Sequence, residues 1–238
     1  MCMAFIAPYT LKAQNDMSNN DLLNSKQQKI VTITGYAVTG NNDSLASELN
    51  KALDEGMTIV ELKEIFLHIY AYAGFPRSIG GSYILMKVVE DRKALGKNDI
   101  EGEEPQVNRN CADKFERGEQ ILVEVTGQTV EESRAGVMGF NSTLDVYLKE
   151  NLFADLFGRN VFSYADRELI TITTLVTTKP METIATQSHF GVGLHNGFTE
   201  SQLRHLLKLV ETKISPEAAE LGNKLLDNAL VVGTKIEQ

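Results

Sequence analysis

The sequence predicts an all-α fold made of two tandem helical repeats. Apolar residues recur every three or four positions from Leu62 to Ala73, which is the spacing of one face of a helix. A pattern that ends one helix and starts the next occurs at 56–62 and again 141 residues later, at 197–203. The segments 29–34 and 168–173 also match closely. Because a unit of a few helices is too small to bury its apolar faces alone, we expect the two repeats to pack together.

Each occurrence of this pattern combines the end of one helix with the start of another. Gly56 favours the left-handed conformation that terminates a helix expected from 44 to 55. Thr58 and Glu61 form a capping box that starts the following helix. The segment 197–203 repeats the same signals in the same order. The pattern therefore predicts two antiparallel helices joined by a tight turn in each repeat.

A third helix is predicted at the end of each repeat. Gly74 can end the helix that starts after Thr58, and Pro76 and Pro216 stand where a new helix could begin with Pro in its first turn. The small residues at 80–82 would let another backbone or a ligand approach this helix closely.

The matching segments 29–34 and 168–173 are rich in Thr and Ile, which favour strands when taken alone. Their context favours helices instead. Ser163 followed by Asp166 is a start signal of the capping-box type, and the residues downstream of both segments have helical periodicity. We therefore predict that both segments are helical.

These signals divide the chain into four parts. Two further helices are expected between the repeats, from about 112 to 126 and from about 142 to 156, where they would help to pack the second repeat against the first. The parts are a leader or flexible N-terminus (1–25), a first repeat (26–95), a linker (96–111) and a second repeat with the extra helices at its start (112–238).

The composition narrows the classes of partner. Of the 238 residues, 42% are apolar, which is enough for a sizeable core. The formal charge of -9 and the sequence pI near 5.0 argue against nucleic acid and anionic membrane surfaces as partners. Cys2 and Cys111 are too few and too far apart for a disulfide framework, a zinc site or a CxxC redox pair.

Residues 1–14 hold a short apolar run followed by a polar stretch. This pattern fits the remnant of a cleaved export signal. Because the run is short and no Lys or Arg precedes it, an ordinary flexible N-terminus is the alternative. The first alternative predicts a periplasmic or secreted protein, and the second predicts a cytoplasmic one. No stretch of the sequence is long and apolar enough to span a membrane.

Three stretches carry a resemblance to a known family. They are ELKEIFLHIYAYAGFP at 61–76, LFGRNVFSYADRELITIT at 156–173 and HFGVGLHNGFTESQL at 189–203. Together they resemble the carboxymuconolactone decarboxylase family in its tandem-domain form. The resemblance covers most of residues 26–230 and implies an all-α fold, a homo-oligomer (dimer, trimer or hexamer), a small carboxylated substrate, and no metal or organic cofactor.

One branch of this family, the alkylhydroperoxidase D type, is a thiol peroxidase with a CxxC pair and a Glu/His proton relay. Glu168 and His189 match the relay residues of that branch. The positions of the two cysteines hold Glu182 and Ala185, and Glu48 stands where the first repeat would have its His. Because the thiolate is the nucleophile in that chemistry, the missing cysteines argue against a dithiol peroxidase.

The decarboxylase branch does not need these thiols, and its reaction requires a group that reprotonates carbon and cations that hold carboxylates. His189, oriented by Glu168, is our candidate for the acid, since the pKa of an imidazole lies near working pH. Arg77 and Arg167 are candidates for binding carboxylates by bidentate pairing. The alternatives are that Glu168 and His189 form a structural pair and that Arg77 satisfies carbonyl groups at the end of its helix.

Glu64, His68 and Tyr72 lie four residues apart and so share one helical face. They would line a substrate-binding wall between the repeats or at a subunit contact, or they would form a solvated face. Since Arg167 and Glu168 are adjacent, at most one of them is expected to point into a shared cavity.

Three functions remain open from the sequence. The first is a cofactor-free lyase that decarboxylates a small carboxylated lactone or keto acid. The second is an antioxidant enzyme related to the alkylhydroperoxidase D (peroxiredoxin-type) branch. The third is a non-catalytic oligomer that binds a small ligand, which predicts a shallow or closed site and no turnover.

Overall fold

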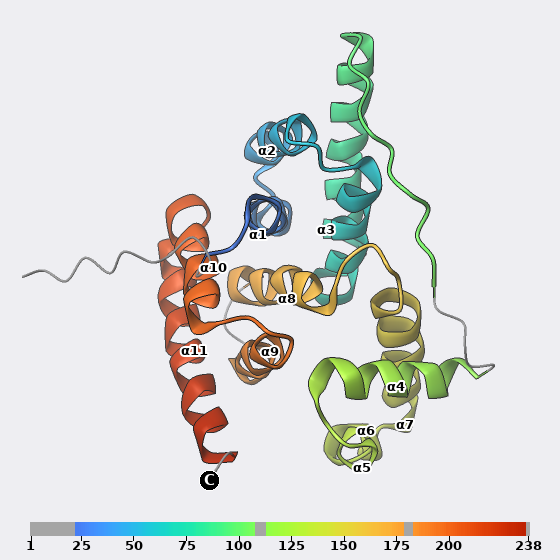
Figure 1. The fold of residues 1–238 in the computed structure, drawn as a ribbon, viewed down its shortest axis with the longest axis vertical. Helices are drawn as coiled ribbons and strands as arrows, with labels where there is room; N and C mark the ends of the chain where they lie inside the picture. The colour runs from blue at the N-terminus through green and yellow to red at the C-terminus, as the bar shows by residue number, and fades with distance from the viewer. Residues whose placement is uncertain (1–21, 108–112, 179–182, 237–238) are drawn as a thin grey trace, which may run out of the picture.

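Helices make up the regular structure of the residues that the computed structural model describes, which are 22–107, 113–178 and 183–236 (Figure 1). The predicted all-α fold is thereby confirmed. The elements are α1 (Ser25–Thr39), α2 (Asn42–Asp54), α3 (Ile59–Ala94), α4 (Lys114–Thr126), α5 (Val130–Ser133), α6 (Gly136–Phe140), α7 (Ser142–Tyr147), a π-helix (Leu148–Phe157), α8 (Tyr164–Thr178), α9 (Thr183–His195), α10 (Glu200–Lys213) and α11 (Pro216–Ile236).

The same order of helices occurs twice. The helices α1, α2 and α3 correspond to α8, α9 and α10 with α11, because α3 contains a break at Gly74 (φ 76°, ψ 167°) that divides it in two. We call residues 59–73 the inner half of α3 and residues 75–94 its outer half. The inner half matches α10, and both start with the predicted capping box, at Thr58 and at Thr199. The outer half matches α11 and contains Pro76 near its start, as the sequence predicts.

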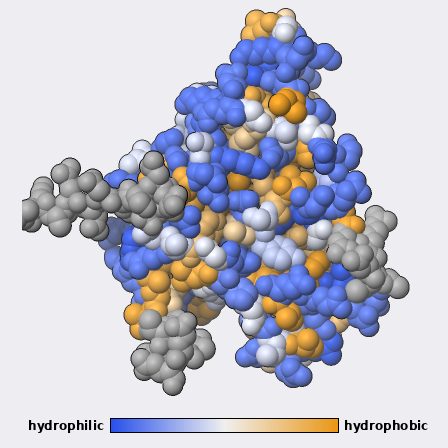
Figure 2. Space-filling model, in the orientation of Figure 1, coloured by the Kyte–Doolittle hydropathy of each residue, from blue (hydrophilic) through white to orange (hydrophobic). Residues whose placement is uncertain are grey.

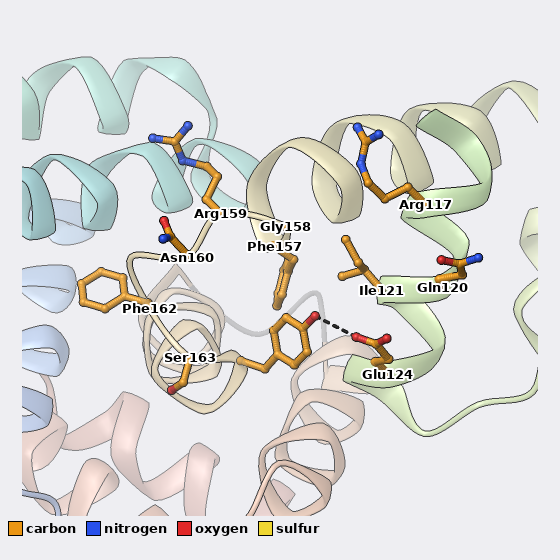
Figure 3. Close-up of a pocket in the computed structure, with 11 residues that line it drawn as sticks. Arg117, Gln120, Ile121, Glu124, Phe157, Gly158, Arg159, Asn160, Phe162 and Ser163 are labelled. Carbon is orange, nitrogen blue, oxygen red and sulfur yellow. Dashed lines mark hydrogen bonds between the residues drawn. The ribbon is translucent and has the colours of Figure 1, made fainter. Parts of the chain in front are cut away.

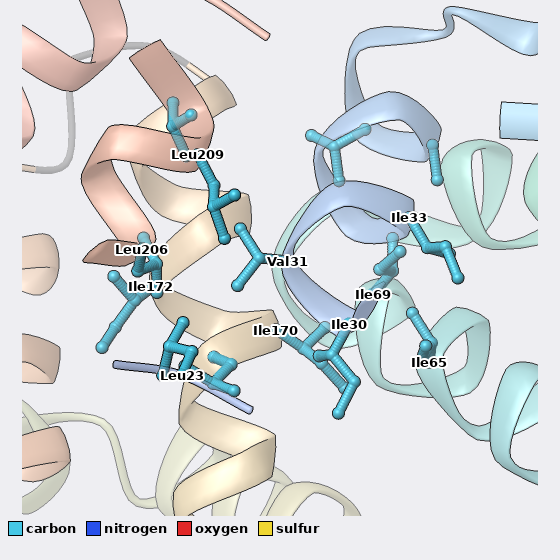
Figure 4. Packing of buried hydrophobic residues seen from close by; sticks show 14 of the residues in the cluster. Leu23, Ile30, Val31, Ile33, Ile65, Ile69, Ile170, Ile172, Leu206 and Leu209 are labelled. Carbon is cyan, nitrogen blue, oxygen red and sulfur yellow. The ribbon is translucent and has the colours of Figure 1, made fainter. Parts of the chain in front are cut away.

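The centre of the molecule is the contact between the two matching helices α1 and α8. The inner half of α3 packs on α8, and α10 packs on α1, so each repeat covers the central helix of the other. Figure 4 shows the side chains that interlock there, including Ile30 and Ile33 from α1 and Ile170 and Ile172 from α8, all fully buried. The Thr- and Ile-rich segments are therefore helical, and burial in this core outweighs their intrinsic preference for strands.

The residues between the repeats form a smaller unit around α4 and the π-helix. Its apolar cluster consists of Ile121, Leu122, Val125, Phe153 and Phe157. The two helices approach so closely that a Cβ atom at Gly118 would lie 1.9 Å from the carbonyl oxygen of Lys149. The π-helix also contacts α3, and α4 contacts α9, so this unit bridges the two repeats as expected.

Our prediction of one α-helix from 142 to 156 is wrong in part. The chain is α-helical only to Tyr147 and continues as a π-helix. At its start the fully buried ammonium group of Lys149 contacts Asp145, one helical turn earlier, and Glu119, which is 30 residues away. Local periodicity does not reveal the pairing with Glu119. The short helices α5 and α6 were not predicted.

Among the described residues, none of the helices is both long and apolar enough to cross a membrane. The predicted signal remnant at 1–14 and both cysteines lie outside the described residues.

Candidate active site

Six of the seven predicted site residues meet where α8 packs against α3 and α9. Arg167 and Glu168 lie on α8 and His189 on α9, while the inner half of α3 contributes Glu64, His68 and Tyr72. As expected for neighbours in sequence, Arg167 faces α3 and Glu168 faces α9. The polar stripe of α3 therefore lies between the two repeats, and Glu64 and His68 are buried there.

Glu168 and His189 form a direct pair. Nδ1 of His189 lies 2.8 Å from Oε2 of Glu168, whose side chain is fully buried, whereas the His189 side chain keeps 23% of its surface exposed. The Glu168 carboxylate accepts the hydrogen bond from Nδ1, so the second ring nitrogen, Nε2, is left for another partner. Burial lowers the pKa of His189, but the charge of Glu168 and its hydrogen bond raise that pKa above the usual value. The pair is thus suited to hold a proton on Nε2.

The first repeat has an ion pair at the equivalent place. Lys29 lies 139 residues before Glu168, Glu48 lies 141 residues before His189, and Nζ of Lys29 is 3.0 Å from Oε1 of Glu48. The two repeats therefore use the same pair of helix positions for an interaction between charged partners. Only the second repeat places a group there that titrates near neutral pH.

Arg167 is neutralised rather than open to a ligand. Its side chain is fully buried, and Nη2 donates to Oε1 of Glu64 at 2.8 Å and to the carbonyl oxygen of Arg159 at 2.9 Å. Glu64 also accepts from Nε of Arg159, at 3.0 Å to each carboxylate oxygen. No role for Arg159 was predicted from the sequence, although it lies inside the family-like stretch LFGRN at 156–160. Its pairing with Glu64 depends on the turn after the π-helix, which local patterns did not predict.

His68 and Tyr72 connect the two carboxylate pairs. Nε2 of His68 lies 2.9 Å from Oγ1 of Thr171, and complete burial with the nearby charges of Arg167 and His189 keeps the pKa of His68 well below its usual value. The ring of Tyr72 stacks on His68 and meets His189 edge-on, with 5.5 Å between centroids in each case. Burial, and then the charge of Glu168, raise the pKa of Tyr72, so its hydroxyl stays protonated.

Several buried polar atoms in this cluster have no hydrogen-bond partner among the described residues. They are Nδ1 of His68, Oε1 of Glu168, and Nε and Nη1 of Arg167. Unsatisfied buried polar atoms are rare in folded proteins and each requires an explanation. These atoms therefore give the cluster hydrogen-bonding capacity that the described side chains do not use.

Arg77 does not join the cluster. It lies on the outer half of α3, is exposed, and places Nη1 against Gly40, the residue that ends α1. A carboxylate bound by Arg77 would therefore not be held by the same group of residues as His189.

A cavity of about 580 Å³ lies beside the polar cluster, between α4 and the segment 157–164 (Figure 3). None of the seven predicted residues lines it. Phe157 forms part of its wall, and the same ring lies 5.2 Å from that of His68 and 6.0 Å from the guanidinium of Arg167. Tyr164, another wall residue, donates to Glu124 at 3.0 Å, and burial together with that carboxylate raises its pKa to about 12. Arg117 and Arg159 supply positive charge to the lining.

A metal site is not indicated by the side chains that the structure describes. Within 22–107, 113–178 and 183–236, no three or more His, Cys, Asp or Glu side chains come together in a way that could hold a metal ion.

Comparison with known proteins gives one family. Residues 7–81 match the model of the carboxymuconolactone decarboxylase family. This match covers Glu64, His68, Tyr72 and Arg77 and ends before the second repeat. The described part of the matched segment runs from α1 into the outer half of α3.

Two relatives show how far the similarity extends. A 4-carboxymuconolactone decarboxylase of Acinetobacter baylyi is 34% identical over 64 residues, which is 27% of this chain and 48% of that protein. An uncharacterized protein of Methanocaldococcus jannaschii is 25% identical over 79 residues, which is 33% of this chain and 74% of that protein. The aligned stretch thus spans about half the length of the decarboxylase.

Proposed function

We propose that this chain, whose residues 7–81 match the model of the carboxymuconolactone decarboxylase family, is a cofactor-free lyase that decarboxylates a small carboxylated lactone or keto acid. The observation that carries this proposal is the contact of 2.8 Å between His189 and a fully buried Glu168. The arrangement supports proton transfer because Glu168 fixes the ring orientation and favours the imidazolium. The partial exposure of His189 leaves the ring accessible to a substrate.

The proposed reaction divides into bond cleavage and proton transfer. The bond between the carboxylate carbon and the substrate breaks, carbon dioxide leaves, and the electron pair moves toward the lactone or keto carbonyl group. The proton on Nε2 of His189 is then transferred to carbon, and solvent restores it. The Tyr72 hydroxyl, which keeps its proton, borders the same ring and is suited to donate a hydrogen bond to the developing oxyanion.

The substrate's carboxylates need cationic partners, and the cavity offers them more directly than the arginines expected from the sequence. Arg159 and Arg117 line the cavity, and its volume of about 580 Å³ lies in the range of small-molecule sites. The Arg159 guanidinium has five N–H donors. The one on Nε bonds to Glu64, and the others belong to Nη1 and Nη2. In this proposal the ring of Phe157, which lies 5.2 Å from that of His68, separates the cavity from the polar cluster that contains His189, and a shift of the Phe157 ring would have to join the two.

A second candidate is the non-catalytic protein that binds a small ligand. Two observations favour it: Arg167 is fully buried and neutralised by Glu64, and the first repeat holds the ion pair of Lys29 and Glu48 where the second holds Glu168 and His189. A pair that occupies this position in both repeats fits a structural role. The antioxidant alternative receives no such support, since the dithiol positions carry Glu182, which lies outside the described residues, and Ala185.

The experiment is carbon dioxide release from 4-carboxymuconolactone and from a panel of β-keto acids, corrected for the uncatalysed rate. The wild-type protein is compared with His189→Gln and with His195→Gln, a control on the same helix whose ring bonds only the carbonyl of Glu124 among the described residues. We expect turnover that falls about 10²–10⁴-fold in His189→Gln and stays unchanged in His195→Gln. Equal activity of His189→Gln and wild type would refute the role of His189. Binding of panel members without turnover would favour the second candidate.

A further inference from the structure

The outer half of α3 exposes a continuous apolar stripe. Phe75, Ile79, Tyr83 and Met86 follow one another at intervals of four, four and three residues, so they lie on one face of the helix. They keep 64%, 63%, 57% and 47% of their surfaces exposed, respectively. In Figure 1 this half rises beyond α2 to the end of the molecule, and in Figure 2 the view of the projection is mostly hydrophilic with hydrophobic surface at its tip. An exposed contiguous apolar patch of this size is often functional.

The second repeat provides an internal comparison for this stripe. An offset of 141 residues aligns the inward faces of the two helices: Gly81 and Gly222 are both buried, and so are Leu85 and Leu226. The two glycines also have equivalent surroundings, since an added Cβ atom would meet Phe66 at Gly81 and Leu207, its counterpart 141 residues on, at Gly222. The register between the outer half of α3 and α11 is therefore fixed by packing.

In this register the outward faces differ in chemistry. Ile79, Tyr83 and Met86 of the first repeat correspond to Glu220, Lys224 and Asp227 of the second. These three charged residues are exposed and paired at the surface: Lys224 bonds Glu220 at 2.7 Å, and Asp227 bonds Arg204 at 2.7 Å. The equivalent face of this helix is thus charged and solvent-exposed in the second repeat but apolar in the first.

We propose that this apolar stripe is the two-fold interface through which two copies of the chain associate. An antiparallel pair of outer halves, with its axis between Ser82 and Tyr83, sets Ile79 of each copy beside Met86 of the other. Ser82 is exposed, and a Cβ atom at Gly80 would meet nothing within 4 Å, so small residues border the axis and allow close approach. Such a pairing is self-complementary, as a two-fold interface requires.

The exposed area is sufficient for a dimer. Phe75 and Tyr83 have roughly 150–250 Å² of side-chain surface each. If Ile79 and Met86 are given about 200 Å² each, the exposed fractions of the four residues amount to at most on the order of 500 Å² per copy. Two copies would bury about 1,000 Å² through these side chains alone, which reaches the lower limit for a specific interface. A second copy therefore suffices to cover the stripe without another protein.

The first test is the mass of the purified full chain by light scattering or sedimentation, for wild type and for Ile79→Glu combined with Met86→Glu. The matched control is Phe140→Glu, which puts the same charge at a residue that is 92% exposed on α6. We expect the wild type and the control to be oligomeric, and the double variant to dissociate with unchanged helix content. A monomeric wild type, or dissociation by Phe140→Glu alone, would overturn the proposal.

The second test examines the antiparallel arrangement of the two outer halves. It uses cross-linking, so it does not require a variant that weakens the interface. In a Cys2→Ser, Cys111→Ser background, Ser82→Cys places a thiol beside the proposed axis, and mild oxidation should yield a covalent dimer. With Lys93→Cys, the two thiols would stand about 32 Å apart along an antiparallel pair, at 1.5 Å per residue, and should not be cross-linked. Cross-linking of both variants, or of Lys93→Cys alone, would contradict the antiparallel arrangement. Failure of Ser82→Cys to cross-link would contradict the interface itself, whether or not the lyase activity is found.

Discussion

His189 of α9 lies 2.8 Å from Glu168 of α8, at the helix positions where the first repeat pairs Glu48 with Lys29. The duplicated fold thus keeps a paired position and changes its chemistry. A lysine and a glutamate form a pair that stays charged across the neutral pH range, whereas a glutamate and a histidine form one that gains and loses a proton there. This difference confines the proposed acid to the second repeat.

The first prediction concerns the pKa of His189. In Glu168→Gln the carboxylate that raises this pKa is removed while burial, which lowers it, remains, so the pKa should fall below 6.5. The wild-type pair stabilises the fold fully below pH 6.5, and this contribution is lost as pH rises through the folded-state pKa of His189. In the variant the dependence should reverse in sign. NMR titration of the His189 ring in both proteins measures the change in pKa. An identical His189 pKa in the two proteins would disprove its coupling to Glu168.

The second prediction concerns the buried pair of Glu64 and Arg167. Glu64→Met leaves the guanidinium of Arg167 buried without its carboxylate and should lower the free energy of unfolding by about 3–5 kcal/mol. Combining it with Arg167→Met removes both buried charges, so the double variant should lose less than the sum of the two single losses. Urea unfolding of the four proteins in this cycle gives the coupling energy. Additive losses would show that the two charges are independent.

The third prediction is a loss of stability in acid that arises from His68. Its pKa is depressed in the folded state, so its contribution is present above pH 6.5 and is lost as pH falls from there toward the folded-state pKa. His68→Phe should remove this part of the pH dependence, and the difference in unfolding free energy between pH 7 and pH 5 should shrink. Urea unfolding of the wild type and of His68→Phe at pH 7 and at pH 5 measures this difference for each protein. An unchanged difference would assign the acid sensitivity to another group, such as His205, whose pKa burial also lowers.

The fourth prediction compares two glycines inside helices. Replacing each by alanine should change the free energy of unfolding in opposite directions. Gly118→Ala would force its Cβ to within 1.9 Å of the Lys149 carbonyl oxygen, so α4 and the π-helix must separate at a cost of about 1–3 kcal/mol. Gly191→Ala, in α9, has nothing within 4 Å of the new methyl group and should stabilise by about 0.5–1 kcal/mol. Thermal unfolding distinguishes the two changes. Equal effects would argue against the close crossing of α4 and the π-helix.

The sequence was most informative where structure depends on neighbouring residues. The capping boxes at Thr58 and Thr199 and the break at Gly74 are local features, and all three are found where expected. The resemblance to the alkylhydroperoxidase D branch also named Glu168 and His189 together, and their side chains lie 2.8 Å apart. The boundaries of the repeats stay predictions.

Contacts between distant residues were beyond local patterns. Arg159 and Glu64 are 95 residues apart, and the buried Lys149 contacts Glu119 from 30 residues away. Partners so far apart leave no helical or strand periodicity in the sequence by which either contact could be predicted. Each pairing neutralises a charge that the fold has buried, and burial is known only once the helices are packed. The role of Arg77 likewise depends on tertiary position, because its helix carries it away from the polar cluster.

The most direct test of the proposed chemistry is the pH dependence of carbon dioxide release by wild type and Glu168→Gln on a panel substrate. If protonated His189 supplies the proton, kcat/KM of the wild type should fall as pH rises through the pKa of His189, which lies above 6.5. In Glu168→Gln the same fall should begin at lower pH, because the pKa of His189 is lower there. Identical pH profiles for the two proteins would contradict His189 as the acid.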